Sequence, residues 1–573
     1  MKRLACVLAL LVIASYFLFF RLGSYGLLET TDARYAEISW EMFQSRDFIT
    51  PRFDFIKHFH KPPFTYWITA LGYYVLGENE WGARFFLGVF GLLTLGGVYC
   101  LARLAFNEVA AAFSVLILLT MLGFLAVTHV LATDLYLLFF TTLAMYCFLR
   151  WEQGKNSLLW GWAVLGLSTL VKGPVAPILV GVTCSLYLIF TGQFKRLRDA
   201  QVGKGLIIFF LFALPWYGWV CLHNKGLFTY FIRTQFFSRI ETGTMGHPHP
   251  WYYYLLILPG LTFPWTFYLF PALGRSLRYL NRMHFFFLLW ALVPFILFSF
   301  MRTKLPFYIL PCLPPLAILL GEWWNNIFKE STPFSRLAQR LMIFLCFAIT
   351  LAAISMAIPL WHGRGNILEW QQLKTLWLGE TFAFVALTLL LYYSHRIRHQ
   401  LLHFAALMGI SYVFLFPLIW YGNILPINTY RILGEQIYQL EGPDDIVVQY
   451  KCYLRSLPFY VKRPTVLVDI PRETQFEENN AYKEIVIDTE TFWKQWEGEK
   501  RLFCVVPKRI LSDFMGKHYY VVAQRRKYIV ITNQPLGMNE ADKFSLVGNS
   551  PFMFLKKTLN AFTHLRIHAF TLS

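Results

Sequence analysis

Thirteen apolar segments, each about as long as a membrane-spanning helix, occur within the first 420 residues of the chain. A transmembrane helix needs roughly 20 mostly apolar residues. One water-soluble core cannot bury so many segments, and 56% of the 573 residues are hydrophobic while only 15% are charged. We therefore expect a polytopic α-helical membrane protein with spans near 4–20, 84–105, 109–128, 131–149, 157–171, 174–191, 204–222, 254–272, 284–300, 305–322, 338–360, 377–394 and 402–420.

The basic residues between these segments predict the orientation, because cytoplasmic loops carry an excess of lysine and arginine. Whether a further apolar stretch at 64–79 crosses the membrane decides on which face the later connections lie. If it only skims the membrane, the basic connections share one face with the N-terminus, namely 195–198, 275–282, 329–340 and 395–399. A full span at 64–79 would scatter them to both faces. We therefore expect 64–79 to be interfacial or re-entrant and the N-terminus to be cytoplasmic.

The composition changes after the last apolar segment. Short strand-like runs alternate there with polar, helix-compatible stretches such as 489–498. The strand-like runs are 446–450, 465–468, 484–488, 502–506, 519–522 and 528–532. We expect a transmembrane domain over 1–428, with an exported first loop over 23–83, and a small α/β domain over 429–573. An odd number of spans places this second domain in the periplasm.

Charge and cysteine content exclude some classes of protein. The net charge of +19 comes largely from the predicted cytoplasmic loops and the C-terminal tail, and no nucleic-acid motif accompanies it. The sequence contains no phosphate-binding Gly-rich loop and no internal repeat, which argues against an ATP-driven pump and a duplicated transporter.

Seven of the nine cysteines lie in apolar segments. Cys452 and Cys504 lie in the predicted exported domain, where they either form a disulfide or are buried strand thiols.

A polar island interrupts the apolar pattern inside the exported loop. Acids, arginines, histidines and a lysine are concentrated there, between Glu29 and Pro63. Charge inside a mostly apolar protein is costly and is usually kept for function. A membrane enzyme that acts on a charged lipid headgroup would need such a loop.

The island and several later motifs resemble a known family. In the first loop the matching residues are Asp32, Arg34, Tyr35, Glu37, Met42, Asp47, Pro51, Arg52, His60, Lys61, Pro62, Pro63, Tyr66 and Trp67. Further along they are Asp134, Leu170 to Pro174, Trp251 to Tyr254, and Lys304 to Pro311. The pattern resembles the bacterial lipid A aminoarabinose transferases and protein mannosyltransferases, which are multispan glycosyltransferases of the GT-C class that use a polyprenyl-phosphate sugar.

The chain departs from the family pattern at two positions. The family has an Asp-Glu pair where this chain has Thr31 and Asp32, so the leading carboxylate is missing from its register. The resemblance therefore implies Asp32 as the substitute, with Glu29 as a competitor on the same loop. The family also has a glutamate before Lys-Pro, where this chain has His60.

Transfer from a polyprenyl phosphate requires cations that hold the departing phosphate. The candidates on the predicted outer face are Lys61, Lys172, Arg34, Arg84, Arg239, Arg302 and Lys304. The alternative is that some of them, Arg84, Arg239 and Arg302 above all, are interfacial anchors that reach toward headgroups. Lys61 and Lys172 lie in tight Pro/Gly contexts that hold a side chain in place.

A carboxylate is needed if the acceptor is a hydroxyl, which must lose a proton as it attacks. Asp32, Asp134 and Glu29 are the catalytic candidates. Asp32 and Asp134 could instead serve only as helix caps. A phosphate acceptor is already ionised, and the acid would then orient a substrate.

Histidines of two exported loops could converge on one divalent ion such as zinc. They are His58, His60, His247 and His249. Most histidines in such loops are only solvated or hydrogen-bonded, so we expect no required cofactor.

Together with this resemblance, the sequence thus predicts an inverting glycosyltransferase of the bacterial inner membrane. It would move a sugar from undecaprenyl phosphate to lipid A or another envelope glycolipid, with no nucleic-acid partner. The alternatives are a protein O-mannosyltransferase-like enzyme and a lipid-linked glycan flippase or polymerase. Clustered acids in the first loop and spans almost free of charge favour the transferase.

Overall fold

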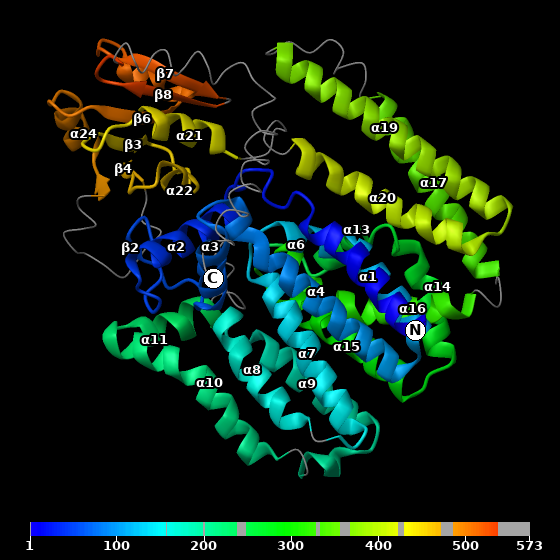
Figure 1. Ribbon diagram of the computed structural model, residues 1–573. Coiled ribbons are helices and arrows are strands. Elements are labelled where there is room, and N and C mark those ends of the chain that lie inside the picture. Colours follow the sequence, from blue (N-terminus) through cyan, green and yellow to red (C-terminus); the bar gives the residue numbers. More distant parts are fainter. Residues whose placement is uncertain are drawn as a thin grey trace, which may run out of the picture. The chain divides into compact units, whose positions relative to one another are not determined.

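The computed structural model describes residues 2–155, 157–198, 201–237, 248–327, 333–355, 367–421, 429–470, 485–525 and 527–536. The chain divides into two compact units (Figure 1), one that ends its main run at Arg431 and one that begins at Ile432. The predicted boundary between 428 and 429 lies just before this division.

Unit 1 is helical, and each of the thirteen predicted apolar segments contains helix. The helices are α1 (Lys2–Phe19), α2 (Thr31–Ser45), α3 (Phe64–Leu76), α4 (Glu80–Ala105), α5 (Glu108–Thr120), α6 (Leu122–His129), α7 (Asp134–Glu152), α8 (Leu158–Lys172), α9 (Val175–Phe190), η1 (Phe194–Arg198), α10 (Val202–His223), α11 (Leu227–Thr229), η2 (Tyr230–Phe237), α13 (Tyr253–Thr262), α14 (Thr266–Arg278), α15 (Arg282–Phe300), η3 (Pro306–Cys312), α16 (Leu313–Ile327), α17 (Pro333–Ser355), α19 (Ile367–Arg396) and α20 (Gln400–Tyr421). A two-stranded antiparallel hairpin, β1 (Arg52–Phe53) and β2 (Ile56–Lys57), joins α2 to α3.

Within the described residues, seven helices are long and apolar enough to cross a membrane, and two bent helix pairs raise the number to nine. Three more apolar helices are shorter: Leu4–Phe19, Leu158–Lys172 and Val175–Phe190. A polytopic membrane protein is therefore confirmed, while thirteen full spans are shown only in part.

The segments predicted to span at 109–128 and 254–272 are each formed by two helices that meet at a bend. α5 and α6 meet at 62°, and α13 and α14 meet at 103°. A hydrogen bond joins the two bends, because the amide of Leu122 donates to the carbonyl of Phe263 at 3.1 Å. Backbone groups freed inside an apolar layer need such partners. This pairing of distant segments leaves no mark in the local hydrophobic pattern.

α3 occupies the apolar stretch of uncertain topology, and its 13 residues rise only about 20 Å. A bilayer core is roughly 30 Å thick, so α3 is too short to cross it upright. α3 packs closely on α4, because a Cβ built on Gly72 would lie 2.1 Å from the carbonyl oxygen of Gly82. It also contacts α2, where the Tyr73 hydroxyl donates to the carbonyl of Ala36 at 2.9 Å. α3 therefore packs against both α2 and α4.

Unit 2 is a small α/β domain, and every predicted strand is present. Its elements are α21 (Arg431–Leu440), β3 (Ile446–Tyr450), α22 (Leu457–Val461), β4 (Val466–Val468), β5 (Val486–Ile487), α24 (Thr489–Trp496), β6 (Leu502–Pro507), η4 (Lys508–Phe514), β7 (Tyr520–Arg525) and β8 (Tyr528–Thr532). The sheet order is β5-β4-β3-β6-β8-β7. The strands β5, β4, β3 and β6 are parallel to one another, and β8 is antiparallel to both of its neighbours, β6 and β7.

Cys452 and Cys504 are both buried and free, so the disulfide is not formed.

Candidate active site

Asp32 and Arg84 form a fully buried ion pair at the start of α2. Both side chains are 0% exposed, and Nη2 of Arg84 lies 2.5 Å from Oδ2 of Asp32. The carboxylate also accepts the amides of Leu28 at 2.8 Å and Leu131 at 2.7 Å. Desolvated charges persist when paired and hydrogen-bonded in this way. In this structure Asp32 is therefore buried and engaged by a guanidinium and two backbone amides.

Arg84 is equally enclosed. Its guanidinium donates to the carbonyls of Tyr25 at 2.8 Å and Gly26 at 3.0 Å, and Cζ lies 4.1 Å from the centre of the Tyr25 ring. The N–H groups of Arg84 donate to Asp32 and to backbone carbonyls, so Arg84 could bind a substrate phosphate only by breaking these hydrogen bonds. The pair instead fixes the loop before α2 against α4 and the segment before α7.

A second ion pair, between Asp134 and Lys172, is only partly buried. Asp134 is the first residue of α7 and Lys172 is the last residue of α8, so the two neighbouring helices present them at the same end. Nζ of Lys172 lies 2.7 Å from Oδ1 of Asp134, and the side chains are 8% and 13% exposed. Gly173 follows with φ +62°, a conformation that glycine adopts readily, and it ends α8 directly after the lysine.

Tyr308 of η3 completes the position of Lys172. The ammonium lies 4.2 Å from the centre of the Tyr308 ring, within the range of a cation–π interaction. Lys172 is therefore held between an anion and an aromatic face and keeps only a small exposed surface. A cation with this geometry can receive an anion while remaining fixed, because its own side chain needs no further ordering.

α2 brings Arg34 and Tyr35 to the same place. Burial raises the pKa of Tyr35 to about 12. The positive charge of Arg34 and a hydrogen bond with Thr133 oppose this rise, and the negative charge of Asp134 adds to it. Arg34 is half-buried, with Cζ 5.7 Å from the centre of the Tyr35 ring. We call Arg34, Tyr35, Asp134, Lys172 and Tyr308 the Asp134 cluster.

The remaining cations of the sequence prediction lie elsewhere or are otherwise engaged. Lys304 is 2% exposed and donates to the carbonyls of His249, at 2.9 Å, and Met301. Burial lowers its pKa. Arg302 is exposed, Lys61 is half-buried, and Arg239 lies outside the described residues. Lys304 therefore links the loop before η3 to the segment at His249.

The described histidines of the sequence prediction contact aromatic rings or one another. The centroids of His58 and His60 are 4.0 Å apart, and His60 stacks on Tyr230 at 6.1 Å. His249 is exposed and stacks on Tyr253, while His247 lies outside the described residues. In the described part of the chain, no three His, Cys, Asp or Glu side chains gather as metal ligands would.

The catalytic candidate Glu29 lies half-buried in the loop just before α2.

α2 carries two buried acids that were not predicted from the sequence as part of a site. Glu37 and Glu41 lie one turn apart, and both oxygens of Glu41 accept the amide of Phe55 at 2.9 Å. Burial raises the pKa of both carboxyls, that of Glu41 to about 7, and Asp54 adds to each rise. The i, i+4 spacing of two acids on a mostly apolar helix face was the available signal.

Two family models match separate parts of the chain. Residues 60–219 match the model described as "Dolichyl-phosphate-mannose-protein mannosyltransferase", and residues 433–533 match the model described as "Aminoarabinose transferase C-terminal domain". The two matches fall in unit 1 and unit 2 respectively. The first contains Asp134 and Lys172, and the second contains the whole sheet of unit 2.

Several curated relatives carry the name undecaprenyl phosphate-α-4-amino-4-deoxy-L-arabinose arabinosyl transferase. The protein from Edwardsiella ictaluri is 30% identical over 378 residues, which cover 64% of this chain and 68% of the relative. The protein from Pseudomonas aeruginosa (strain LESB58) is 30% identical over 334 residues, which cover 56% of this chain and only 60% of the relative.

Crystal structures of ArnT from Cupriavidus metallidurans share the fold. The apo structure superimposes with a TM-score of 0.78 at 26% identity, over 93% of this chain and 99% of that chain. The structure bound to undecaprenyl phosphate gives a TM-score of 0.77 at 24% identity, over 92% and 98%. The likeness extends over both units.

Proposed function

The chain belongs to the family of undecaprenyl phosphate-α-4-amino-4-deoxy-L-arabinose arabinosyl transferases, and from this premise we propose that it transfers an aminoarabinose-like sugar from undecaprenyl phosphate to lipid A or a related envelope glycolipid. It is a multi-pass membrane protein of the GT-C fold. We place it in the bacterial inner membrane, with the N-terminus in the cytoplasm and unit 2 in the periplasm, because this orientation keeps the basic connections on the cytoplasmic side.

The observation that carries the proposal is the fixed ammonium of Lys172. In the transfer, the acceptor attacks the anomeric carbon, the bond from that carbon to the carrier phosphate breaks, and the configuration inverts. The phosphate then carries an additional negative charge. Lys172 and Arg34 stabilise that charge, and Asp134 and Tyr308 hold the ammonium in position for it.

The role of the carboxylates depends on the acceptor. A phosphate acceptor needs no proton removal, and Asp134 then acts only as a positioning residue for Lys172. A hydroxyl acceptor needs a base, and Asp134 is the candidate because only its Oδ1 is engaged by Lys172. Glu29 competes for the same task. Asp32 is assigned to the buried pair with Arg84 instead, and Lys61 and Arg302 remain candidates for outer contacts with the donor.

A transfer assay tests the proposal. The full chain in lipid nanodiscs receives undecaprenyl phosphate carrying labelled 4-amino-4-deoxy-L-arabinose, together with lipid A. We expect label on lipid A, and we expect Lys172→Gln to lower the rate by about 100-fold. Lys225→Gln, which changes an exposed lysine after α10, is the matched control. Absence of label on lipid A with the native chain would refute this acceptor and donor pair.

A protein O-mannosyltransferase-like activity is the second candidate, because residues 60–219 match the mannosyltransferase model. The same assay separates the two when a polyprenyl-phosphate mannose donor and a Ser/Thr-rich peptide replace the first pair. Label on the peptide, with none on lipid A, would favour the second candidate. Retention of all label on the carrier would exclude both transferases and leave a flippase or polymerase.

A further inference from the structure

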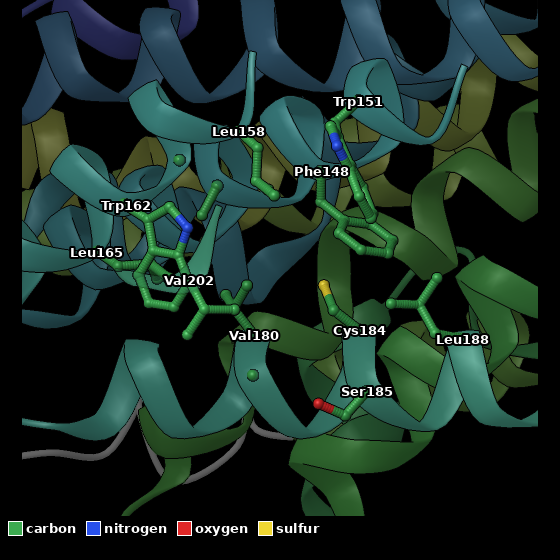
Figure 2. A pocket seen from close by; sticks show the side chains of 13 residues that line it. Phe148, Trp151, Leu158, Trp162, Leu165, Val180, Cys184, Ser185, Leu188 and Val202 are labelled. Carbon is green, nitrogen blue, oxygen red and sulfur yellow. The ribbon is translucent and has the colours of Figure 1, made fainter. Parts of the chain in front are cut away.

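An apolar cavity of about 160 Å³ lies among α7, α8 and α9 and the first residue of α10, Val202. Figure 2 shows Phe148 and Trp151 on one wall and Trp162, Val180 and Leu188 around the rest. All four helices contribute the ends that lie away from Asp134 and Lys172. α7 has 19 residues and therefore rises about 28 Å. The cavity is thus a feature separate from the Asp134 cluster.

The cavity has room for an apolar chain. Gly181 lies on its wall and is exposed, and a Cβ built there would meet no atom within 4 Å. Walls that face empty space lose their dispersion contacts, and an apolar cavity does not hold water well. In a bilayer the available filler is a lipid chain. A lipid chain alone would give no selectivity, because lipid tails are as apolar as these walls.

Cations at the same ends of the helices supply the selectivity. Lys155 follows α7, Lys195 and Arg196 lie in η1 after α9, and Lys204 lies in the first turn of α10. The three lysines are exposed. Arg196 donates to the carbonyl of Glu152 at 2.9 Å, and its Cζ lies 5.0 Å from the centre of the Trp151 ring. A basic group therefore lies directly beside a residue of the cavity wall.

Among the described residues at this end, the acids are fewer than the cations. Glu152 is the one acid of α7 at this end, and its Oε1 accepts from the Tyr187 hydroxyl at 3.4 Å and from Nε2 of Gln193 at 3.5 Å. Basic pockets between membrane helices attract anionic lipid headgroups. We propose that the cavity binds one acyl chain of an anionic phospholipid, whose phosphate contacts Lys155, Lys195 and Lys204. This site would lie in the leaflet opposite the Asp134 cluster.

Native mass spectrometry of the full chain tests the proposal. The detergent-purified protein receives phosphatidylglycerol or phosphatidylcholine, and the retained lipid is counted. Gly181→Leu fills the cavity, and Gly96→Leu is its control because Gly96 of α4 is also exposed and also has free space around a Cβ. A Lys155→Gln, Lys195→Gln, Lys204→Gln triple variant removes the charge, with Lys225→Gln at the other end of α10 as its control.

We expect one phosphatidylglycerol to be retained per chain, in preference to phosphatidylcholine. Gly181→Leu and the triple variant should each lower its retention by about tenfold or more, while both controls retain it. Equal retention of the two lipids would overturn the proposal, and so would full retention by both test variants. If Gly181→Leu changes the elution profile or the melting temperature, the triple variant decides alone. Displacement of phosphatidylglycerol by added undecaprenyl phosphate would assign the cavity to the carrier and overturn the proposal.

Discussion

Asp134 and Lys172 join the first residue of α7 to the last residue of α8 through an ion pair of 2.7 Å. The pair is open enough to meet a substrate and enclosed enough to keep its geometry. Asp32 and Arg84, which form a closer pair 0% exposed, lack the first property. Exposure, more than residue type, therefore separates the two acid–base pairs into a candidate active site and a structural support.

Asp134→Asn should distinguish positioning from base catalysis. If Asp134 only holds Lys172, its replacement should raise KM for the donor and lower kcat by about tenfold, with an unchanged pH profile. If it is the base for a hydroxyl acceptor, kcat should fall by about 100-fold or more and the acidic limb of the kcat profile should disappear. Steady-state transfer rates between pH 5 and 9 measure both. Glu108→Gln, at an exposed surface position, should leave them unchanged.

Tyr308→Leu should weaken the hold on Lys172 without removing charge. The cation–π contact at 4.2 Å is worth about 1 kcal/mol or somewhat more. We therefore expect a loss of about tenfold in kcat/KM, with partial recovery in Tyr308→Phe, which keeps the aromatic face. Equal activity of Tyr308→Leu and the native chain would show that Asp134 alone positions the ammonium.

Asp32→Asn should destabilise the protein, because the neutral amide leaves the guanidinium of Arg84 buried without the negative charge of its partner. Breaking a buried ion pair costs about 3–5 kcal/mol. Arg103→Gln removes an ion pair whose side chains are 42% and 46% exposed, and it should cost at most about 1 kcal/mol. Thermal unfolding in one detergent compares the two. A small effect of Asp32→Asn on the melting temperature, with a large effect on transfer, would restore Asp32 as a catalytic candidate.

The buried acids of α2 predict a dependence of stability on pH. Burial raises the pKa of Glu41 from an ordinary value of 4.5 to about 7, so the folded state binds the proton more tightly than the unfolded state. The free energy of unfolding should therefore fall as pH rises from about 4.5 to about 7, and Glu37 should act in the same direction. Glu41→Gln should flatten this fall. Melting temperatures measured between pH 4.5 and 8 check it, and an identical slope in Glu41→Gln would contradict the assignment.

Gly72→Ala should disturb the contact between α3 and α4. Its Cβ would lie 2.1 Å from the carbonyl oxygen of Gly82, a backbone atom that cannot rotate away. We expect a loss of about 1–3 kcal/mol. Gly96→Ala in α4 has free space and should be neutral or slightly stabilising, because alanine favours a helix. Similar melting temperatures for the two variants would show that α3 can shift.

Local patterns predicted the elements of this protein well. The six strand-like runs of unit 2 and the helix after Asp488 appear as expected, because alternation and capping are encoded within a few residues. Asp134 and Lys172 were also candidates from sequence, since each follows or ends an apolar run. Their mutual contact was not predicted, because nothing local relates the end of one helix to the start of another.

The features that could not be predicted arise where distant segments meet. Asp32 is separated from Arg84 by 52 positions and from Leu131 by 99, and its burial depends on both contacts. The break between α5 and α6 likewise depends on Phe263. A single chain without aligned relatives gives no signal for such pairs, so the accessibility of a charged side chain could not be read from its neighbours in sequence.

The dependence of the Asp134 cluster on η3 sets an order for biogenesis. Arg34 and Tyr35 leave the ribosome early, but Lys172 gains its aromatic support only when Tyr308 has been inserted, after more than half of the 573 residues have been synthesised. A nascent chain that stops before Pro306 therefore carries the acids and cations of the cluster in an unassembled form. Premature termination should yield membrane-inserted but inert fragments, so a cell would face no partial activity from incomplete copies.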